Sequence, residues 1–343
     1  MASPGDTRRL EALGVGDRFS GDSVDIYINQ SCNLTCTTCF LGDNYFANPY
    51  DMDIQTFAEI VRWAVDQGVY DVALLGGEPT LHPALEEMIS LARKSGVTRI
   101  RLVTNGTAPF RRYLKHASDF PDVVYLSLDG TTDLHNDEIR GKGTHAQVLR
   151  AIELLDAHQI EYTLTSTLSL ASSSRVANLI DMAEETGCST LNIHWLSPTG
   201  RAALHPHLTV PVEHWLPVVD FVSRYVPTRP DFSVRIQQAF ASQGDEAARH
   251  CAVRENQNLQ FFPDGSVYAC GLAVSIPELR GRRWSGSRPE LVDTERNELT
   301  ICAVPQDGCP VRMAGAVSVP SDSLHTSDTI PVCIYNRIAD ASH

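Results

Sequence analysis

Cys32, Cys36 and Cys39 stand close together in the segment SCNLTCTTCF, with the spacing C-x3-C-x2-C. Thiols this close cannot all pair with one another as disulfides, and soft sulfur ligands suit an iron–sulfur cluster or zinc. Structural zinc would need a further Cys or His nearby, and the first candidate, His82, is far along the chain. A [4Fe–4S] cluster held by only these cysteines would keep one iron open for another molecule.

Two glycines and a carboxylate form a second candidate site. Gly76, Gly77, Glu78 and Pro79 come directly after the apolar run DVALL. Adjacent glycines let the backbone approach a ligand closely, and a carboxylate can accept hydrogen bonds from an ammonium group. The segment therefore predicts a ligand-binding turn.

The order of these motifs, with the aromatic Phe40 after the last cysteine, resembles the radical S-adenosylmethionine (SAM) superfamily. The resemblance implies that the open iron binds the amino and carboxylate groups of SAM. Reductive cleavage of SAM then yields methionine and a 5'-deoxyadenosyl radical, which abstracts a hydrogen atom from the substrate. It also implies that the GGEP segment, through its backbone and Glu78, binds the amino group of SAM.

Further polar residues at the ends of predicted strands resemble the SAM-contacting positions of the same superfamily. On this resemblance we expect the following residues to contact SAM: Thr104, Asn105, Ser127, Asp129, Arg140 and Leu196. Leu196 is the candidate for packing on the adenine. His194 and Trp195 precede it, and only one of these two side chains can face the substrate because side chains alternate along a strand.

The remaining cysteines are mostly C-terminal. Cys251 and Cys270 flank the segment NLQFFPDGSVYA, which predicts a β-hairpin with an Asp-Gly turn. This pattern, with Cys309 in the run DGCP, resembles the SPASM and twitch domains that hold auxiliary [4Fe–4S] clusters. Too few cysteines are present for two such clusters, so we expect one auxiliary cluster on Cys251, Cys270, Cys309 and either Cys333 or Cys302.

The elements that must position these residues alternate between strands and helices. We expect strands over 24–29, 72–75, 98–104, 123–128, 162–168 and 190–196. Between them, apolar residues recur with helical spacing, as in Phe57, Ile60, Val61 and Ala64. Successive βα units predict an α/β fold with a parallel sheet, here a partial (β/α)6 TIM-like barrel, whose chemistry lies at the carboxyl ends of the strands.

The rhythm of strands and helices stops after about residue 226. We therefore expect an N-terminal tail over 1–22, a radical SAM barrel over 23–230, and a SPASM- or twitch-like auxiliary cluster domain over 231–343. The last region is poor in core-building residues and needs metal ligands to stabilise it.

Composition limits the possible partners and location. The 343 residues carry a formal net charge of -14, which argues against a nucleic-acid partner. No apolar run is long enough to span a membrane or to form a signal peptide, so we expect a cytoplasmic enzyme. Nine cysteines, an odd number, then indicate metal ligands and free thiols.

The expected function is that of a radical SAM oxidoreductase served by a flavodoxin- or ferredoxin-type electron donor. Few residues precede the first strand, whereas peptide-modifying relatives commonly carry an N-terminal leader-binding module. This favours a small polar metabolite, such as an aminocyclitol, as substrate. The alternatives are a peptide maturase that forms crosslinks or epimerises residues, and a redox-neutral sugar epimerase with a cysteine hydrogen donor, for which Cys188 is one candidate.

Overall fold

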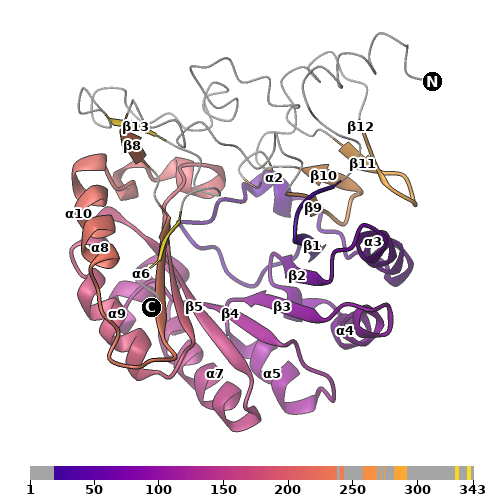
Figure 1. The fold of residues 1–343 in the computed structure, drawn as a ribbon, viewed down its shortest axis with the longest axis horizontal. Helices are drawn as coiled ribbons and strands as arrows, with labels where there is room; N and C mark the ends of the chain where they lie inside the picture. Colours follow the sequence, from indigo (N-terminus) through magenta and orange to yellow (C-terminus); the bar gives the residue numbers. More distant parts are fainter. Residues whose placement is uncertain are drawn as a thin grey trace.

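The computed structural model describes residues 19–237, 240–242, 258–268, 271, 274, 282–291, 329–331 and 338–340. Within these ranges a curved sheet carries its helices along the outer face (Figure 1). The described part thus has the form of an open, partial barrel.

Parallel strands lie side by side in chain order. They are β1 (Ser23–Asn29), β2 (Asp71–Gly76), β3 (Arg99–Thr104), β4 (Val123–Ser127), β5 (Glu161–Leu168), β6 (Thr190–Trp195) and β7 (Ser233–Gln237). The first six were predicted to within a residue at each end, because each is an apolar run buried under helices. The predicted partial α/β barrel is confirmed.

Strand β7 lies just beyond the predicted domain boundary at residue 230. It pairs in parallel with β6, with Leu191 opposite Val234 and Ile193 opposite Ile236. The barrel sheet therefore continues for one strand past that boundary.

The longer helices cover the outer face of this sheet (Figure 1). The helices are α2 (Asp43–Phe46), α3 (Ile54–Asp66), α4 (Leu85–Lys94), α5 (Ala108–His116), α6 (Asp133–Arg140), α7 (Thr144–His158), α8 (Leu170–Ser173), α9 (Val176–Glu185) and α10 (Val212–Ser223), with short 3-10 turns η1 (Pro79–Leu81), η2 (Gly200–Leu204) and η3 (Pro206–Leu208). The short α2 lies beside β9 and β10 instead (Figure 1). In α3 the side chain of Asp53 accepts a hydrogen bond from the Thr56 N–H at 2.9 Å and so caps the helix. The predicted apolar face of α3 is fully buried against the sheet.

Side chains alternate between the two faces of the sheet. On β5 and β6, Leu164, Leu191 and Ile193 belong to the core beneath the helices. Their neighbours Thr165, Asn192 and His194 therefore face the barrel interior. This part of the interior is lined by polar side chains.

Strands from the C-terminal region extend both edges of the barrel sheet. On the β1 edge lie β9 (Gln260–Phe261), β10 (Ser266–Tyr268), β11 (Arg282–Trp284) and β12 (Pro289–Leu291); on the β7 edge lies β14 (Ile338–Asp340). Strands β8 (Phe240–Ser242) and β13 (Thr329–Pro331) form a separate pair. The predicted hairpin with an Asp-Gly turn is confirmed by the antiparallel pairing of β9 and β10.

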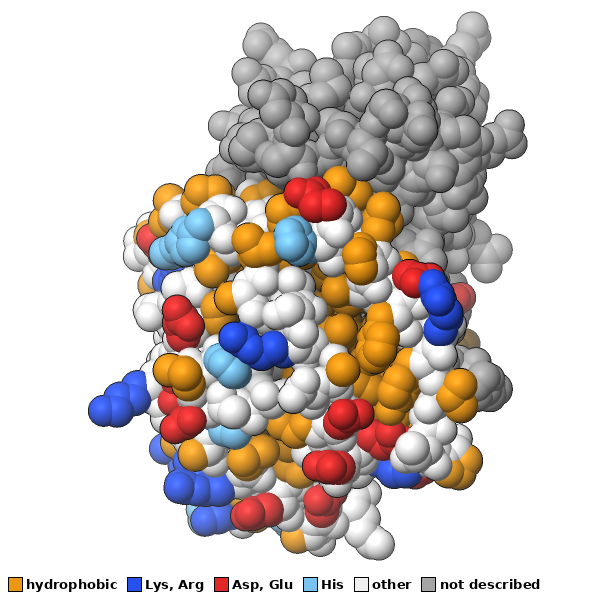
Figure 2. Space-filling model, turned by 90° about the vertical axis from the view of Figure 1, so that its left-hand side faces the viewer, with side chains coloured by type: hydrophobic (Ala, Val, Ile, Leu, Met, Phe, Trp, Pro, Cys, Tyr) orange, Lys and Arg blue, Asp and Glu red, His pale blue; other side chains and the backbone are white. Residues whose placement is uncertain are grey.

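The surface agrees with the acidic composition. On the face shown in Figure 2, Asp and Glu side chains are spread over the described residues among Lys, Arg and neutral side chains. No helix in the described ranges is both long enough and apolar enough to cross a membrane.

Candidate functional site

The loop that carries the three cysteines begins where β1 ends and is held from two sides. The Thr37 N–H donates to the carbonyl of Ile139 on α6 at 3.0 Å. On the other side, the Ala202 N–H of η2 donates to the carbonyl of Cys39 at 3.1 Å. Gly200 permits this approach, because a Cβ on it would lie 2.1 Å from the carbonyl oxygen of Phe40. We refer to residues 30–42 as the cysteine loop.

The donor set of the cysteine loop fits an iron–sulfur cluster. Cys32, Cys36 and Cys39 are free, half-buried thiols, and burial raises the pKa of Cys32 to about 12. A bound metal cluster would favour the thiolate form, and thiolates are the cluster ligands. The Leu34 N–H points to the Cys32 sulfur at 3.4 Å, which favours the thiolate.

A single metal ion suits the described residues less well. Within them, no three His, Cys, Asp or Glu side chains converge as ligands of one ion. A four-iron cluster presents a different iron to each cysteine, so its ligands need not meet at one point. Zinc is therefore the weaker interpretation of the cysteine triplet.

The GGEP segment lies against the cysteine loop. A Cβ on Gly77 would come within 2.4 Å of the Ser31 carbonyl oxygen and 2.9 Å of the Cys32 Cβ. Both contacts are too short, so only glycine fits here. The Gly77 N–H donates to the Asn29 carbonyl at 3.1 Å, and the Glu78 N–H donates to that of Ser31 at 2.8 Å.

Glu78 is almost fully buried and links the ends of β2 and β3. Its Oε1 accepts hydrogen bonds from both the N–H and hydroxyl of Thr80 and from the Thr104 hydroxyl at 2.7 Å. Its Oε2 accepts the Asn105 N–H at 2.8 Å. Burial raises the pKa of Glu78, and these hydrogen bonds oppose the shift. Oε2 is thus the atom with acceptor capacity left for an ammonium group.

The end of β4 carries a buried ion pair. Arg140 Nε lies 2.7 Å from Asp129 Oδ2, and the Thr167 N–H donates to Asp129 Oδ1 at 2.8 Å. Arg140 also lies close enough to Cys36 to oppose the rise that burial causes in the pKa of that thiol. Ser127 ends the strand two residues before Asp129 and is half-buried. The structure thus brings Asp129 and Arg140 together beside the cysteine loop.

In strand β6, His194 faces the barrel interior and Trp195 faces outward. Trp195 packs in the outer core and donates from Nε1 to the Val210 carbonyl at 2.9 Å. His194 faces the interior, and burial lowers its pKa to about 4, so its ring is neutral at physiological pH. Leu196 follows and is fully buried.

Two asparagines that the sequence analysis did not single out connect these parts. Asn29 donates from Nδ2 to the Glu78 carbonyl at 2.8 Å, and Asn33 accepts from Asn105 Nδ2 at 3.0 Å. The first bond ties the end of β1 to the GGEP segment, and the second ties the cysteine loop to the residue that follows β3. Little in the sequence marks these two residues as part of the site. Asn29 is a polar residue at the end of an apolar strand, and Asn33 lies between the first two cysteines.

The cysteines expected to hold the auxiliary cluster lie outside the described residues: Cys251, Cys270, Cys302, Cys309 and Cys333. Their assignment stays a prediction. The hairpin that precedes Cys270 is described and shares an apolar cluster with the cysteine loop, as shown below.

Comparison with known proteins decides the family. The model of the radical SAM superfamily matches residues 26–171. The mycofactocin maturase MftC of Mycobacterium ulcerans (strain Agy99) is 30% identical over 262 residues, covering 74% of this chain and 69% of the maturase. The chain belongs to the radical SAM superfamily.

Two further relatives are similar to this chain over most of its length, one in sequence and one in structure. A serine-type anaerobic sulfatase-maturating enzyme of Klebsiella aerogenes is 27% identical over 323 residues, covering 84% of this chain and 79% of the relative. The structure of Streptococcus suis SuiB bound to its precursor peptide SuiA matches with a TM-score of 0.61 at 14% identity, covering 90% of this chain and 72% of SuiB. In the structure of SuiB bound to SAM, the chain spans 66% of SuiB. The SuiB likeness shows the shared fold.

The cofactors follow from this membership. Radical SAM enzymes use SAM and a [4Fe–4S] cluster, and relatives of the SPASM or twitch type carry auxiliary [4Fe–4S] clusters. The expected superfamily and cofactors are therefore confirmed. Which residues of this chain hold each cofactor belongs to the proposal below.

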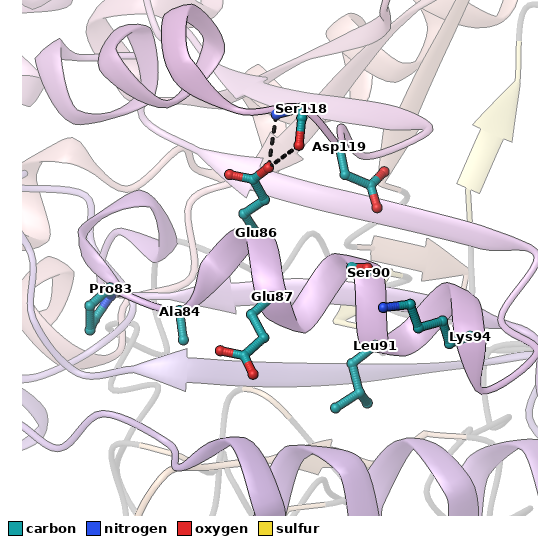
Figure 3. A pocket seen from close by; sticks show the side chains of 9 residues that line it. All are labelled: Pro83, Ala84, Glu86, Glu87, Ser90, Leu91, Lys94, Ser118 and Asp119. Carbon is teal, nitrogen blue, oxygen red and sulfur yellow. Dashed lines mark hydrogen bonds between the residues drawn. The ribbon is translucent and has the colours of Figure 1, made fainter.

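A groove on the outside of the radical SAM barrel has a different character. It runs along α4 beside Glu86, Glu87 and Lys94 (Figure 3), and Glu86 accepts hydrogen bonds from the Ser118 N–H and hydroxyl. None of the predicted site residues lines it. It is a surface feature of α4 and not part of the candidate site.

Proposed function

We propose that this enzyme is a radical SAM peptide maturase. Its relatives carry names of that kind: a sulfatase-maturating enzyme, a mycofactocin maturase, and SuiB with its precursor peptide. The sulfatase-maturating enzyme supports the proposal most, since the similarity runs over 84% of this chain. This favours the peptide alternative over the small polar metabolite expected from the sequence.

In this proposal Cys32, Cys36 and Cys39 hold the SAM-binding cluster. When bound, the cluster and SAM supply the 5'-deoxyadenosyl radical that removes a hydrogen atom from the peptide. The GGEP backbone fixes the shape of the turn beside the loop, and Glu78 Oε2 offers an acceptor to the SAM ammonium. Arg140, held by Asp129, presents a positive charge beside Cys36 for the SAM carboxylate.

The remaining assignments of the proposal concern the adenosine and the electrons. Thr104, Asn105 and Ser127 stand at strand ends around SAM, and Leu196 with Phe40 packs beside its adenosine. Cys251, Cys270, Cys309 and either Cys333 or Cys302 would hold one auxiliary cluster, which would supply an acceptor for the electron of the substrate radical. A flavodoxin- or ferredoxin-type protein of the cytoplasm supplies electrons to the SAM-binding cluster.

The epimerase alternative gains no support from Cys188. That thiol lies just before the start of β6, whereas the cysteine loop follows the end of β1. Because the barrel strands are parallel, the two lie at opposite ends of the strands. It is fully buried in the outer core, and its Sγ donates to the Ala183 carbonyl at 3.2 Å. Cys188 is a core residue and not a hydrogen donor to the substrate.

The proposal is tested by supplying candidate peptides. The anaerobically reconstituted enzyme, with SAM and dithionite, would be incubated with each short peptide encoded beside its gene, and the peptides analysed by mass spectrometry. We expect one of them to change mass with matching formation of 5'-deoxyadenosine, and the Cys36→Ala variant to leave it unmodified. Modification of a small polar metabolite, with every peptide unchanged, would overturn the proposal.

A further inference from the structure

The hairpin β9–β10 is joined to the barrel by its backbone and by two aromatic side chains. Strand β9 pairs in parallel with β1, with Phe261 opposite Ile26. Phe261 and the next residue, Phe262, are both almost fully buried, and they point to opposite faces of the sheet. The hairpin therefore reaches two different environments through adjacent residues.

Phe261 packs on the outer side, away from the candidate site. Its ring lies 5.5 Å from that of Trp63 on α3 and 5.7 Å from that of Trp284 on β11. Phe261 belongs to the core beneath the helices, and the two tryptophans pack against that core. Phe261 thus fixes the hairpin to the barrel without approaching the cysteine loop.

Phe262 packs on the inner side. Its ring stacks on Tyr27 of β1, with centroids 4.2 Å apart and an angle of 14° between the planes. It also makes edge-to-face contacts with Tyr45 at 5.9 Å and with Tyr268 at 5.3 Å. We call the apolar group around Phe262 the inner aromatic cluster; its buried members are Tyr27, Leu41, Tyr45, Phe262, Tyr268 and Val274.

The inner aromatic cluster is continuous with the cysteine loop. Leu41 belongs to both, and Cys39 and Phe40 pack against the cluster. The Tyr45 hydroxyl donates to the Asn29 carbonyl at 2.9 Å, at the point where β1 passes into the loop. Phe262 and Cys39 therefore border the same apolar cluster.

We propose that Phe262 is a positioning residue for the SAM-binding cluster: it closes the Cys39 side of the cysteine loop against water and thereby sets the reduction potential of that cluster. This inference rests on the proposed assignment of the cluster to the cysteine loop. Solvent exposure is one of the factors that set iron–sulfur potentials. Water stabilises the more negative, reduced cluster better than an apolar surround does, so opening this side raises the potential.

The chain offers a matched pair of variants for the test. Phe262→Leu and Phe261→Leu make the same change at adjacent, equally buried positions of one hairpin. Each would be measured as reconstituted full-length enzyme for iron content, thermal unfolding, and redox titration followed by electron paramagnetic resonance. The signal that changes on adding SAM identifies the SAM-binding cluster, since only that cluster has an open iron in the proposed assignment.

We expect both variants to unfold at similarly lowered temperatures, because both lose packing of the hairpin. Only Phe262→Leu should raise the midpoint potential of the SAM-responsive signal and slow 5'-deoxyadenosine formation several-fold. Phe262→Tyr, which keeps the ring, should restore the wild-type potential. If Phe262→Leu does not fold, Tyr27→Leu removes the stacked partner and should give the same rise.

Equal potentials in the Phe262, Phe261 and wild-type proteins would overturn the role of Phe262, as would equal shifts in both leucine variants. The assignment of the cluster to the cysteine loop has its own test. It would be refuted if the variant with Cys32, Cys36 and Cys39 replaced by alanine still showed the SAM-responsive signal of the wild type.

Discussion

At the scale of single residues, the candidate site separates side chains that would hold a cofactor from those that hold the site together. The three cysteines are free thiols. Glu78 and Asp129, in contrast, already have partners within the protein: Glu78 accepts hydrogen bonds, and Asp129 pairs with Arg140. Buried carboxylates of this kind need their partners, because an unpaired buried charge is costly. The two groups should respond differently to mutation.

Replacing Cys32, Cys36 and Cys39 together by alanine should abolish formation of 5'-deoxyadenosine and leave the auxiliary cluster in place. Reconstituted wild type should hold roughly eight irons per chain and the triple variant roughly four, one cluster being lost. Iron and acid-labile sulfide analysis would measure this. A variant without any iron would show that the C-terminal cysteines hold no cluster.

His194 makes the stability of the fold depend on pH. Its folded-state pKa of about 4 lies below its ordinary value of 6.5, so below pH 6.5 the unfolded chain binds a proton that the folded one does not. Stability is therefore lost as the pH falls from 6.5 towards 4, by up to about 1.4 kcal/mol per pH unit.

Urea unfolding of wild type and His194→Gln at pH 7.5 and at pH 5.5 would reveal this dependence. Wild type should lose about 1 kcal/mol more than the variant between the two conditions. An equal loss in both proteins would mean that the ring is not kept neutral by its surroundings.

At the scale of elements, the GGEP segment lies so close to the cysteine loop that Gly77 has no room for a side chain. Gly77→Ala should disrupt the contact between the GGEP segment and the cysteine loop, destabilising the protein by about 1–3 kcal/mol and weakening SAM binding. Gly42→Ala is the control, because its nearest obstacle is the movable end of the Asn44 side chain. Thermal unfolding and SAM calorimetry measure both effects, and equal behaviour of the two variants would speak against the close approach.

The elements also show what a sequence can predict. The first six strands were found because each is an apolar run whose residues are buried by helices, as in Val72 and Leu74 of β2. Strand β7 was missed because the segment SVRIQ is short, half polar and preceded by a stretch rich in proline. Helix α6 has no apolar stripe of this kind: it is mostly polar and buries Asn136, whose Oδ1 accepts the Asp129 N–H.

The candidate site was predictable as motifs but not as contacts. The cysteine triplet and GGEP stand out by composition and order. The links through Asn29, Asn33 and Phe262 depend on residues far apart in the chain coming together, and no local pattern encodes them. His194 and Trp195 could be told apart only once the strand had a defined inner and outer face.

At the scale of the whole molecule, the fate of the substrate radical distinguishes the possible reactions. If an auxiliary cluster accepts the electron, the substrate is oxidised, and one SAM is consumed per product. In D2O the product should then be lighter by two hydrogens and carry no non-exchangeable deuterium, as mass spectrometry would show. A product of unchanged oxidation state with one such deuterium would instead indicate epimerisation by an exchangeable thiol.

The pairing of β9 with β1 and of β14 with β7 has a consequence for how the protein is made. An open parallel sheet has two edges with unpaired N–H and C=O groups, and such edges template aggregation. Strands β9 and β14 both lie later in the chain than β7. The ribosome therefore synthesises all the parallel strands while both edges of their sheet are still unpaired. We therefore expect the nascent chain to be most prone to aggregation between the synthesis of β7 and that of β14.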